Sequence, residues 1–463
     1  MSTKATVNTH PLNTKSPKVC VIIGHSIEAI TSAVVLASLD HTVHLYADLT
    51  MLAQQVEQYS FERHLQALWQ LYIQQQHIIS LALPDNAHQL IQHYDNVDNR
   101  QQDIVGNDAN SDSNHDQACC YWLFLDSVKS AWTDDTWVMA FNQSHRPEIP
   151  IVMSGIEKLG RVAKLAQHLR RAWVFYVPFV FLQDGEAYSS MLKPSLWLLG
   201  EKTPDSSHHL KALQPLMQQA RAYHHADIAT IEFARSSIMA MLATRVSFMN
   251  ELSRLADSQQ VDIGEVSQIM GLDARVGSSY LQAGWGFGGH TLPTELAKLQ
   301  QSGQDNSVNM PLLQSVLHIN NDQKELIFRK FWQYFDGFID NKTVVIWGGS
   351  YKSGSGRTTG SAIHPLLALL WSYNIKTLVY SDKAKLSLMK HYSEQPLLQL
   401  LESPYEQLND AQAVFIISLS PQHQLDVAQL NQQAMPIFDA QNALSRTQIN
   451  ALVGAYIGIG RSK

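Results

Sequence analysis

The chain contains two copies of one pattern: a short apolar run that ends at glycine, then an apolar helical segment, then a second apolar run. The first copy comprises residues 19–23, Gly24, a helix reaching residue 39, and residues 43–46. The second copy has the same parts in the same order: residues 343–347, Gly348, a helix near 365–373, and residues 376–380. Strand, turn, helix and strand in succession are the opening of a parallel sheet covered by helices. The repetition predicts two such units.

Between the two copies, residues 215–255 have helical apolar spacing and contain no glycine, and no proline after residue 215. One or two long helices are expected there. We therefore predict an α/β protein with two Rossmann-like doubly wound domains, 1–205 and 326–463, joined by a central α-helical domain, 206–325. The remaining strands are expected at residues 121–125, 149–153, 173–181, 414–418 and 436–439. Residues 100–118 are so polar that we expect a disordered loop.

Composition excludes several classes of protein. The 463 residues suit two or three domains, and a formal net charge of −7 without a basic stripe argues against a nucleic-acid partner. The longest apolar run, residues 172–182, contains a proline and falls short of the roughly 18 residues that a membrane helix needs. The polar first residues suggest no secretory signal, and three cysteines suggest no disulfide framework. We expect a cytoplasmic protein with no membrane contact and no metal site.

Residues 283–295 form a glycine-dense loop, and five of them carry a resemblance to a known family. Gly286, Phe287, Gly288, Gly289 and Pro293 match the signature of the UDP-glucose/GDP-mannose dehydrogenase family, Gly-Phe/Tyr-Gly-Gly-Ser-Cys-Phe/Leu-Pro-Lys-Asp. The signature's cysteine carries a covalent thiohemiacetal and then a thioester in that family. In this chain the substituted positions of the motif are His290, Thr291, Thr294 and Glu295.

The resemblance implies that Thr291 stands at the position of the nucleophilic cysteine and Glu295 at that of the aspartate. A threonine hydroxyl is a poor nucleophile unless a base activates it. His290 is adjacent, but chain neighbours seldom point together, so we expect a packed or exposed loop threonine rather than a Thr291/His290 pair.

The segment 232–251 is similar to the family's central helix, with Leu242-Ala-Thr-Arg245 and Asn250-Glu251 matching. In this register Arg235 falls on the catalytic lysine and Met239 on the catalytic asparagine. Arginine keeps a charge but has a planar fork, and methionine offers no hydrogen-bond donor. The resemblance therefore implies that the groups that stabilise the oxyanion in the family are missing here. The alternative is that Met239 packs and Arg235 faces solvent or an acid.

Residues 178–185 are similar to the family's Asn-Pro-Glu-Phe-Leu-Arg-Glu-Gly, with Val180 at the first glutamate and Asp184 at the second. Asp184 could hold a water, but its reach is one methylene shorter than that of glutamate. The family's Ser-Thr-Val-Pro segment is reduced to Ser154-Gly155. Most positions that carry the family's chemistry have therefore changed.

The first glycine turn stands in the place of the dinucleotide fingerprint G-x-G-x-x-G. Gly24 fits its first position and Ala29 is an accepted variant at its third, whereas Ser26 places a side chain where the backbone should approach the pyrophosphate. Glu28 adds a negative charge beside the helix N-terminus that should receive phosphate. Asp48 is the candidate acid for the ribose hydroxyls. We expect binding of the cofactor NAD to be weak or lost, with intact binding as the alternative.

Positions on the substrate side are better matched. Arg275 lies in Asp273-Ala-Arg-Val-Gly277, similar to the family's Asp-x-Arg-Ile-Gly, and Tyr280, Gly288 and Lys352 fall at its phosphate-binding, sugar-binding and Ser-Phe-Lys positions. A cation and a phenol hydroxyl suit a diphosphate. After Lys352 the match to the family weakens, since Arg357 and Thr359 stand where the family has an aspartate and an arginine. The alternative is that the basic residues are surface cations on a glycine-rich loop without a ligand.

The resemblance spans nearly the whole chain and implies a nucleotide-sugar dehydrogenase relative from polysaccharide precursor synthesis, with impaired catalysis and a homodimer through the central helices. Two alternatives stay open. One is an active NAD-dependent oxidoreductase with altered chemistry, stopping at the aldehyde. The other is a non-catalytic scaffold partner of an active paralogue. The sugar nucleotide is also open between UDP-glucose, an N-acetylated UDP-hexosamine and GDP-mannose.

Overall fold

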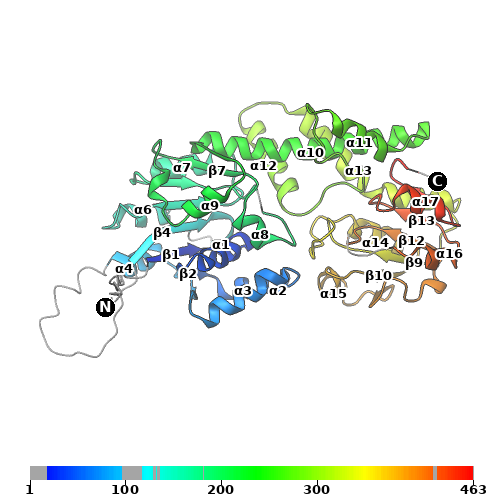
Figure 1. Ribbon diagram of the computed structural model, residues 1–463, viewed down its shortest axis with the longest axis horizontal. Coiled ribbons are helices and arrows are strands. Elements are labelled where there is room, and N and C mark those ends of the chain that lie inside the picture. The colour runs from blue at the N-terminus through cyan, green and yellow to red at the C-terminus, as the bar shows by residue number, and fades with distance from the viewer. Residues whose placement is uncertain are drawn as a thin grey trace, which may run out of the picture.

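A computed structural model describes residues 18–95, 117–128, 132, 136–180, 182–420 and 425–461 of the chain. It confirms the predicted fold class: two mainly parallel sheets, each covered by helices, flank a helical region (Figure 1). Of the predicted loop at 100–118, residues 117 and 118 belong to a strand, and the rest lies outside the described residues. Among the described helices none is both long and apolar enough to cross a membrane.

The first sheet has eight strands in the order β3-β2-β1-β4-β5-β6-β7-β8. Neighbours are parallel from β3 to β6, β7 runs antiparallel to β6, and β8 is parallel to β7. Both faces are buried, in agreement with the nearly continuous apolar runs of its central strands. The strands are β1 (Lys18–Ile23), β2 (Thr42–Ala47), β3 (Ile78–Ala82), β4 (Gln117–Phe124), β5 (Ile151–Ser154), β6 (Val174–Tyr176), β7 (Trp197–Glu201) and β8 (Tyr223–Asp227).

The second sheet has six parallel strands in the order β11-β10-β9-β12-β13-β14. Both sheets thus reverse their strand order beside the first strand of the unit, between β1 and β4 and between β9 and β12. Ligands of open α/β sheets bind outside the carboxyl ends of the strands at such points. The strands are β9 (Thr343–Trp347), β10 (Lys376–Tyr380), β11 (Leu398–Leu401), β12 (Ala413–Ile416), β13 (Ile437–Asp439) and β14 (Tyr456–Gly458).

The helix α10 (Ile228–Gln259) runs along the molecule from the first unit to the second (Figure 1). It begins where the Asp227 carboxylate accepts the backbone N–H of Thr230 at 3.0 Å, and it ends at Gln260 in the left-handed conformation. The other helices of the central region are α11 (Ile263–Leu272), α12 (Thr291–Asp305) and α13 (Pro311–Tyr334). The first unit contains α1 (Ile27–Ser38), α2 (Leu49–Gln58), α3 (Arg63–Gln74), α4 (Ala87–Asp95), α6 (Thr136–Gln143), α7 (Arg161–His168), α8 (Ala187–Leu192) and α9 (Gln214–Gln219); the second contains α14 (Ile363–Ser372), α15 (Lys385–His391), α16 (Val427–Asn431) and α17 (Arg446–Ala451).

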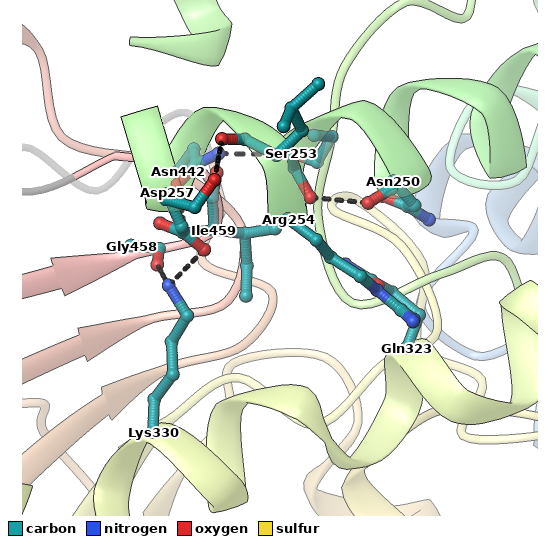
Figure 2. A network of polar contacts seen from close by, with 12 residues as sticks. Asn250, Ser253, Arg254, Asp257, Gln323, Lys330, Asn442, Gly458 and Ile459 are labelled. Carbon is teal, nitrogen blue, oxygen red and sulfur yellow. Dashed lines mark hydrogen bonds and ion pairs between the residues drawn. The ribbon is translucent and has the colours of Figure 1, made fainter. Parts of the chain in front are cut away.

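Polar contacts fasten the far end of α10 to the second unit (Figure 2). The Lys330 ammonium on α13 reaches the Asp257 carboxylate on α10 at 2.6 Å and the carbonyl of Gly458 in β14 at 2.7 Å. One turn earlier on α10, the Arg254 guanidinium donates to the Gln323 side chain at 3.0 Å. Because these contacts join α10, α13 and the edge of the second sheet, the second unit is held against the central helices.

Two predicted elements were wrong in extent. The stretch from residue 215, expected to be wholly helical, contains β8, so the first sheet continues past the predicted domain boundary at 205. The residues of β8, Tyr-His-His-Ala-Asp, are largely exposed at the sheet edge and therefore lack the alternating apolar pattern of a strand. The strand expected over 173–181 is only three residues long, since Pro178 has no N–H for the ladder.

Candidate functional site

A cavity of about 690 Å³ lies between α10, the glycine-dense loop and the loop that follows β9. Its lining includes residues from both units, with Phe179 from the first and Ile417 from the second. Five of the residues predicted from sequence line it together: Met239, Tyr280, Gly288, Thr291 and Lys352. The structure therefore brings together three of the four expected substrate positions and two expected chemistry positions.

The glycine-dense loop is held in place from two sides. Asn320 on α13 accepts the backbone N–H of Phe287 at 2.7 Å and donates to its carbonyl at 3.0 Å. From the second unit, the carbonyl of Thr359 accepts the N–H of Gly289 at 2.9 Å. At Gly288 an added Cβ would lie 2.4 Å from the carbonyl oxygen of Gly360, so only glycine allows the two loops to approach this closely. Packing between the units thus explains the shape of the loop.

Thr291 is the first residue of α12 and is partly exposed to the cavity. Within the described part of the chain, its hydroxyl has no hydrogen-bond partner that could act as a base. The adjacent His290 instead points its Nδ1 toward the hydroxyl of Thr294, at 3.4 Å. Desolvation lowers the pKa of His290, with Arg357 and Lys298 adding to the shift and Glu28 opposing it, so the neutral imidazole is favoured at pH 7. The hydrogen bond of His290 in the structure is therefore with Thr294 and not with Thr291.

Arg235 on α10 forms a buried ion pair with Glu295 on α12. The two side chains are 5% and 1% exposed, and the Ser236 hydroxyl donates to the same carboxylate at 3.0 Å. Of the two alternatives for Arg235, the structure has the one in which it faces an acid. Both members of the pair lie beside the cavity rather than in its lining, whereas Met239, one turn along α10, presents its thioether to the cavity.

Asp184, after β6, is enclosed by the second unit. Its Oδ2 accepts from the Tyr351 hydroxyl at 2.8 Å, the Ser355 hydroxyl at 3.0 Å, and Nε and Nη2 of Arg357 at 2.9 and 2.7 Å. Burial opposes ionisation of this carboxyl, but Arg357, Lys352 and the hydrogen bonds outweigh it and lower its pKa. The oxygen that could have oriented a water is thus fully engaged by protein donors.

Arg357 itself lies between two aromatic rings, 5.2 Å from the centroid of Tyr59 and 5.3 Å from that of Tyr351. Glu62, also in the first unit, holds the segment that follows Asp184, because its carboxylate accepts the backbone N–H groups of Gly185 and Ala187. Sequence reasoning missed Tyr59 and Glu62, which match no motif. Arg357 was noted only as a substitution, although its basic character was the available signal.

The first glycine turn meets the requirements of a dinucleotide fingerprint at its first position but not at the positions that follow. Gly24 has a φ of 140°, and a Cβ there would lie 2.4 Å from the Ser127 hydroxyl. Ser26 caps α1 by accepting the N–H of Ala29 at 3.3 Å, and Asp48 caps α2 by accepting the N–H of Thr50 at 3.0 Å. Ser26, expected to obstruct the pyrophosphate, and Asp48, expected to hold the ribose hydroxyls, therefore both cap the helices that they precede.

The charge at this turn is unfavourable for a phosphate. Desolvation and the nearby Asp126 carboxylate raise the pKa of Glu28, and Arg357 opposes the shift. Desolvation likewise raises the pKa of Asp126, while the Ile156 N–H at 3.3 Å and Arg235 oppose the shift. Two carboxyl groups therefore stand where the fingerprint places a pyrophosphate.

Arg275 is the one predicted substrate residue that the structure places outside the cavity. Its side chain is 90% exposed and pairs with Asp273, two residues earlier, at 2.7 Å. A contact with a ligand in the cavity of the same chain would require a rearrangement of this segment.

Comparisons with known proteins agree with the fold and the loop. A family model described as "UDP-glucose/GDP-mannose dehydrogenase family, central domain" matches residues 229–322, which cover α10 after its first residue, α11, α12 and the first half of α13. A UDP-glucose 6-dehydrogenase of Pseudomonas aeruginosa is 27% identical over 290 residues, 61% of this chain and 64% of that protein. YwqF, a UDP-glucose 6-dehydrogenase of Bacillus subtilis, is 26% identical over 284 residues, 61% of this chain and 63% of that protein. The chain thus spans just under two thirds of the length of these relatives.

Solved structures extend the likeness of fold to the whole chain. A UDP-glucose dehydrogenase from Pyrobaculum islandicum superimposes with a TM-score of 0.74 at 16% identity, covering 98% of this chain and all of the other. A UDP-D-ManNAc dehydrogenase from Pyrococcus horikoshii gives 0.69 at 13% identity, covering 96% and 99%.

Proposed function

Since this chain belongs to the UDP-glucose/GDP-mannose dehydrogenase family, we propose that it binds a nucleotide sugar without carrying out the family's oxidation. The observation that carries the proposal is the cavity between the units, in which Lys352, Tyr280 and Gly288 line the space together with Thr291 and Met239. Lys352, Tyr280 and Gly288 have side chains or backbone suited to binding a sugar nucleotide. Thr291 and Met239 lack the groups needed to oxidise it.

The binding half of the proposal rests on charge and shape. Lys352 is an exposed residue of the cavity lining, and its ammonium is a point charge that can pair with a diphosphate. Tyr280, a lining residue that is 47% exposed, adds a hydroxyl donor. Glycines at 286, 288 and 289 leave backbone close to the cavity, where a sugar ring can approach. A volume of about 690 Å³ lies within the range of small-molecule sites.

The loss of oxidation follows from the nucleophile position. Oxidising a primary alcohol to an acid removes two hydrides, and the aldehyde formed first must gain a nucleophile at its carbonyl carbon before the second hydride can leave. A thiolate supplies that sulfur–carbon bond readily, whereas the Thr291 hydroxyl has a much higher pKa and no base beside it. Met239 offers no donor to the oxyanion that the addition would create.

The cofactor side supports the same proposal. NAD would bring a pyrophosphate to the Gly24 turn, where Glu28 and Asp126 present carboxyl groups. The Arg357–Asp184 contact also holds the second unit's loop against the first unit, next to this turn. We propose that the affinity for NAD is strongly reduced.

A homodimer is part of the proposal. Large apolar side chains are exposed along α10: Phe233, Met241, Phe248 and Leu255 are 58%, 60%, 47% and 58% exposed. The last three are spaced seven residues apart and so lie on one face of the helix. Leu272 at the end of α11 is 85% exposed nearby. An apolar stripe of this kind on a long helix fits a second copy of the same helix.

Calorimetric titration of the full chain with UDP-glucose, GDP-mannose and N-acetylated UDP-hexosamines tests the binding half. We expect one of them to bind with a stoichiometry of one per chain and the Lys352→Ala variant to bind it at least tenfold more weakly. Lys390→Ala, an exposed lysine on α15 away from the cavity, is the matched control and should bind as the wild type does. If no sugar nucleotide binds, the chain is a scaffold without a small-molecule ligand.

A further inference from the structure

The three cysteines of the chain lie together in the structure, although two of them are about a hundred residues from the third. Cys20 is in β1, and Cys119 and Cys120 are in β4. Their sulfur atoms all lie within 4.8 Å of one another, and the sulfurs of Cys20 and Cys119 are 3.3 Å apart. No disulfide joins them. A chain of 463 residues with only three cysteines has therefore placed all of them at one point.

A β-bulge produces this convergence. In the ladder between β1 and β4, Val19 pairs with Ala118 and Cys20 pairs with Cys120, so Cys119 is an extra residue on the β4 side. Successive residues of a regular strand point to opposite faces, and Cys119 and Cys120 would then be separated by the sheet. A bulge interrupts that alternation and redirects a side chain. Here it lets Cys119 pack on the same core cluster that contains Cys20 and Cys120.

We propose that Cys20, Cys119 and Cys120 bind one soft d10 metal ion, Zn²⁺ or Cu⁺, through three thiolate sulfurs. Metal–sulfur bonds of about 2.3 Å hold three sulfurs about 3.8 to 4.0 Å apart in tetrahedral or trigonal coordination. The observed separations, from 3.3 Å up to a limit of 4.8 Å, surround that value. Thiolates select these ions over hard cations such as Mg²⁺. Cys119 is only partly buried and offers the route of entry, while Cys20 and Cys120 are buried.

Two other roles for the cluster fit less well. A disulfide between Cys20 and Cys119 would not account for the sulfur of Cys120, which lies within 4.8 Å of both. A reactive thiol has to be accessible to its partner, whereas Cys20 and Cys120 are buried. The cluster lies in the amino-terminal halves of β1 and β4, away from the carboxyl edge that faces the cavity, so it is independent of the proposed nucleotide-sugar site.

Titration of the reduced, chelator-treated full chain tests the proposal. Cd²⁺, as a spectroscopic substitute for Zn²⁺, should produce a thiolate-to-metal charge-transfer band that saturates at one equivalent. Zn²⁺ and Cu⁺ are then added in separate arms with a competing chromophoric chelator, and the ion held more tightly is the one the site prefers. The 20 histidines of the chain can bind Zn²⁺ but cannot give a thiolate band.

Cys119→Ser should remove the band and weaken binding at least tenfold, with an unchanged circular dichroism spectrum because Cys119 is partly exposed. Val35→Ala, which loosens the same core cluster but keeps all three thiols, is the control and should still bind one equivalent. In the wild type, a bound ion should also slow alkylation of Cys119, a readout that needs no variant. Absence of the band, an unchanged band in Cys119→Ser, or unchanged alkylation would overturn the proposal.

Discussion

Arg357 of the second unit and Asp184 of the first form an ion pair in which both Nε and Nη2 contact one carboxylate oxygen, at 2.9 and 2.7 Å. The side chains are 12% and 11% exposed, so the pair is shielded from solvent. The contact joins the two units directly, and it occupies the acid that sequence comparison placed at a water-orienting position. The contact that holds the two units together therefore also engages this acid.

Arg357→Ala should lower the free energy of unfolding by about 3 to 5 kcal/mol, because it leaves the Asp184 carboxylate shielded without its partner. Urea denaturation followed by circular dichroism measures the change. The control is Lys390→Ala, which breaks another pair between the units, with Glu57 at 2.6 Å, whose side chains are 53% and 54% exposed. That variant should cost about 1 kcal/mol or less. Equal losses for the two variants would show that shielding of the pair is unimportant.

The same pair predicts a pH dependence. The pKa of Asp184 is lowered in the folded protein, so its ion pair stabilises the fold at any pH above the ordinary value of 3.8. The stabilisation is lost as the pH falls from 3.8 through the lower folded value. Asp184→Asn should therefore show a smaller loss of thermal midpoint on acidification than the wild type. A steeper loss in the variant would contradict the assignment.

Glu28→Gln should strengthen the binding of NAD, since it removes one of the two carboxyl groups at the Gly24 turn. In the wild type the raised pKa of Glu28 means that lowering the pH toward the ordinary value of 4.5 protonates the group early and should also favour NAD. His290, which gains charge on acidification, would add to this effect, so the comparison with Glu28→Gln isolates the carboxyl. Calorimetry at two pH values measures both, and an unchanged affinity in the variant would remove the electrostatic explanation.

Thr291→Cys should place a thiol in the cavity and still give no NADH, because Met239 supplies no oxyanion donor and the Gly24 turn disfavours NAD. Peptide mapping after alkylation should find the new thiol modified, and bound sugar nucleotide should protect it. This protection shows that residue 291 faces the ligand. Restoration of oxidation by the single change would mean that the rest of the site is intact.

Phe248→Asp should convert the proposed homodimer into a monomer, because it puts a charge in the middle of the apolar stripe on α10. Light scattering after size exclusion measures the mass. Met389→Asp changes a side chain that is 50% exposed on α15, outside the stripe, and should leave the mass unchanged. A wild-type monomer would rule out the dimer.

The fold could be predicted because its evidence is local. Runs such as 19–23 and 343–347 are apolar without interruption, and a buried parallel strand requires that pattern. The edge strand β8 could not be predicted, since exposed residues such as His224 carry no burial pattern, and its pairing with β7 is a tertiary contact. The early end of β6 was readable in principle from Pro178.

Only those residues of the candidate site that belong to one short continuous motif could be predicted from the sequence. The loop around Gly288 and the position of Thr291 came from one short signature, and the cavity brings them together with Lys352 from far along the chain. The partners of Asp184 could not be inferred, because Tyr351, Ser355 and Arg357 reach it from the other unit. The convergence of Cys20 with Cys119 was equally hidden, since it depends on a bulge.

The central claim is that a nucleotide sugar occupies the cavity lined by Thr291 without being oxidised. The most direct measurement incubates the protein with NAD and whichever sugar nucleotide it binds, and follows NADH absorbance together with mass spectrometry of the sugar. The account predicts a bound, unchanged sugar nucleotide and no NADH above a protein-free control. NADH formed in proportion to an aldehyde or uronic acid product would contradict it.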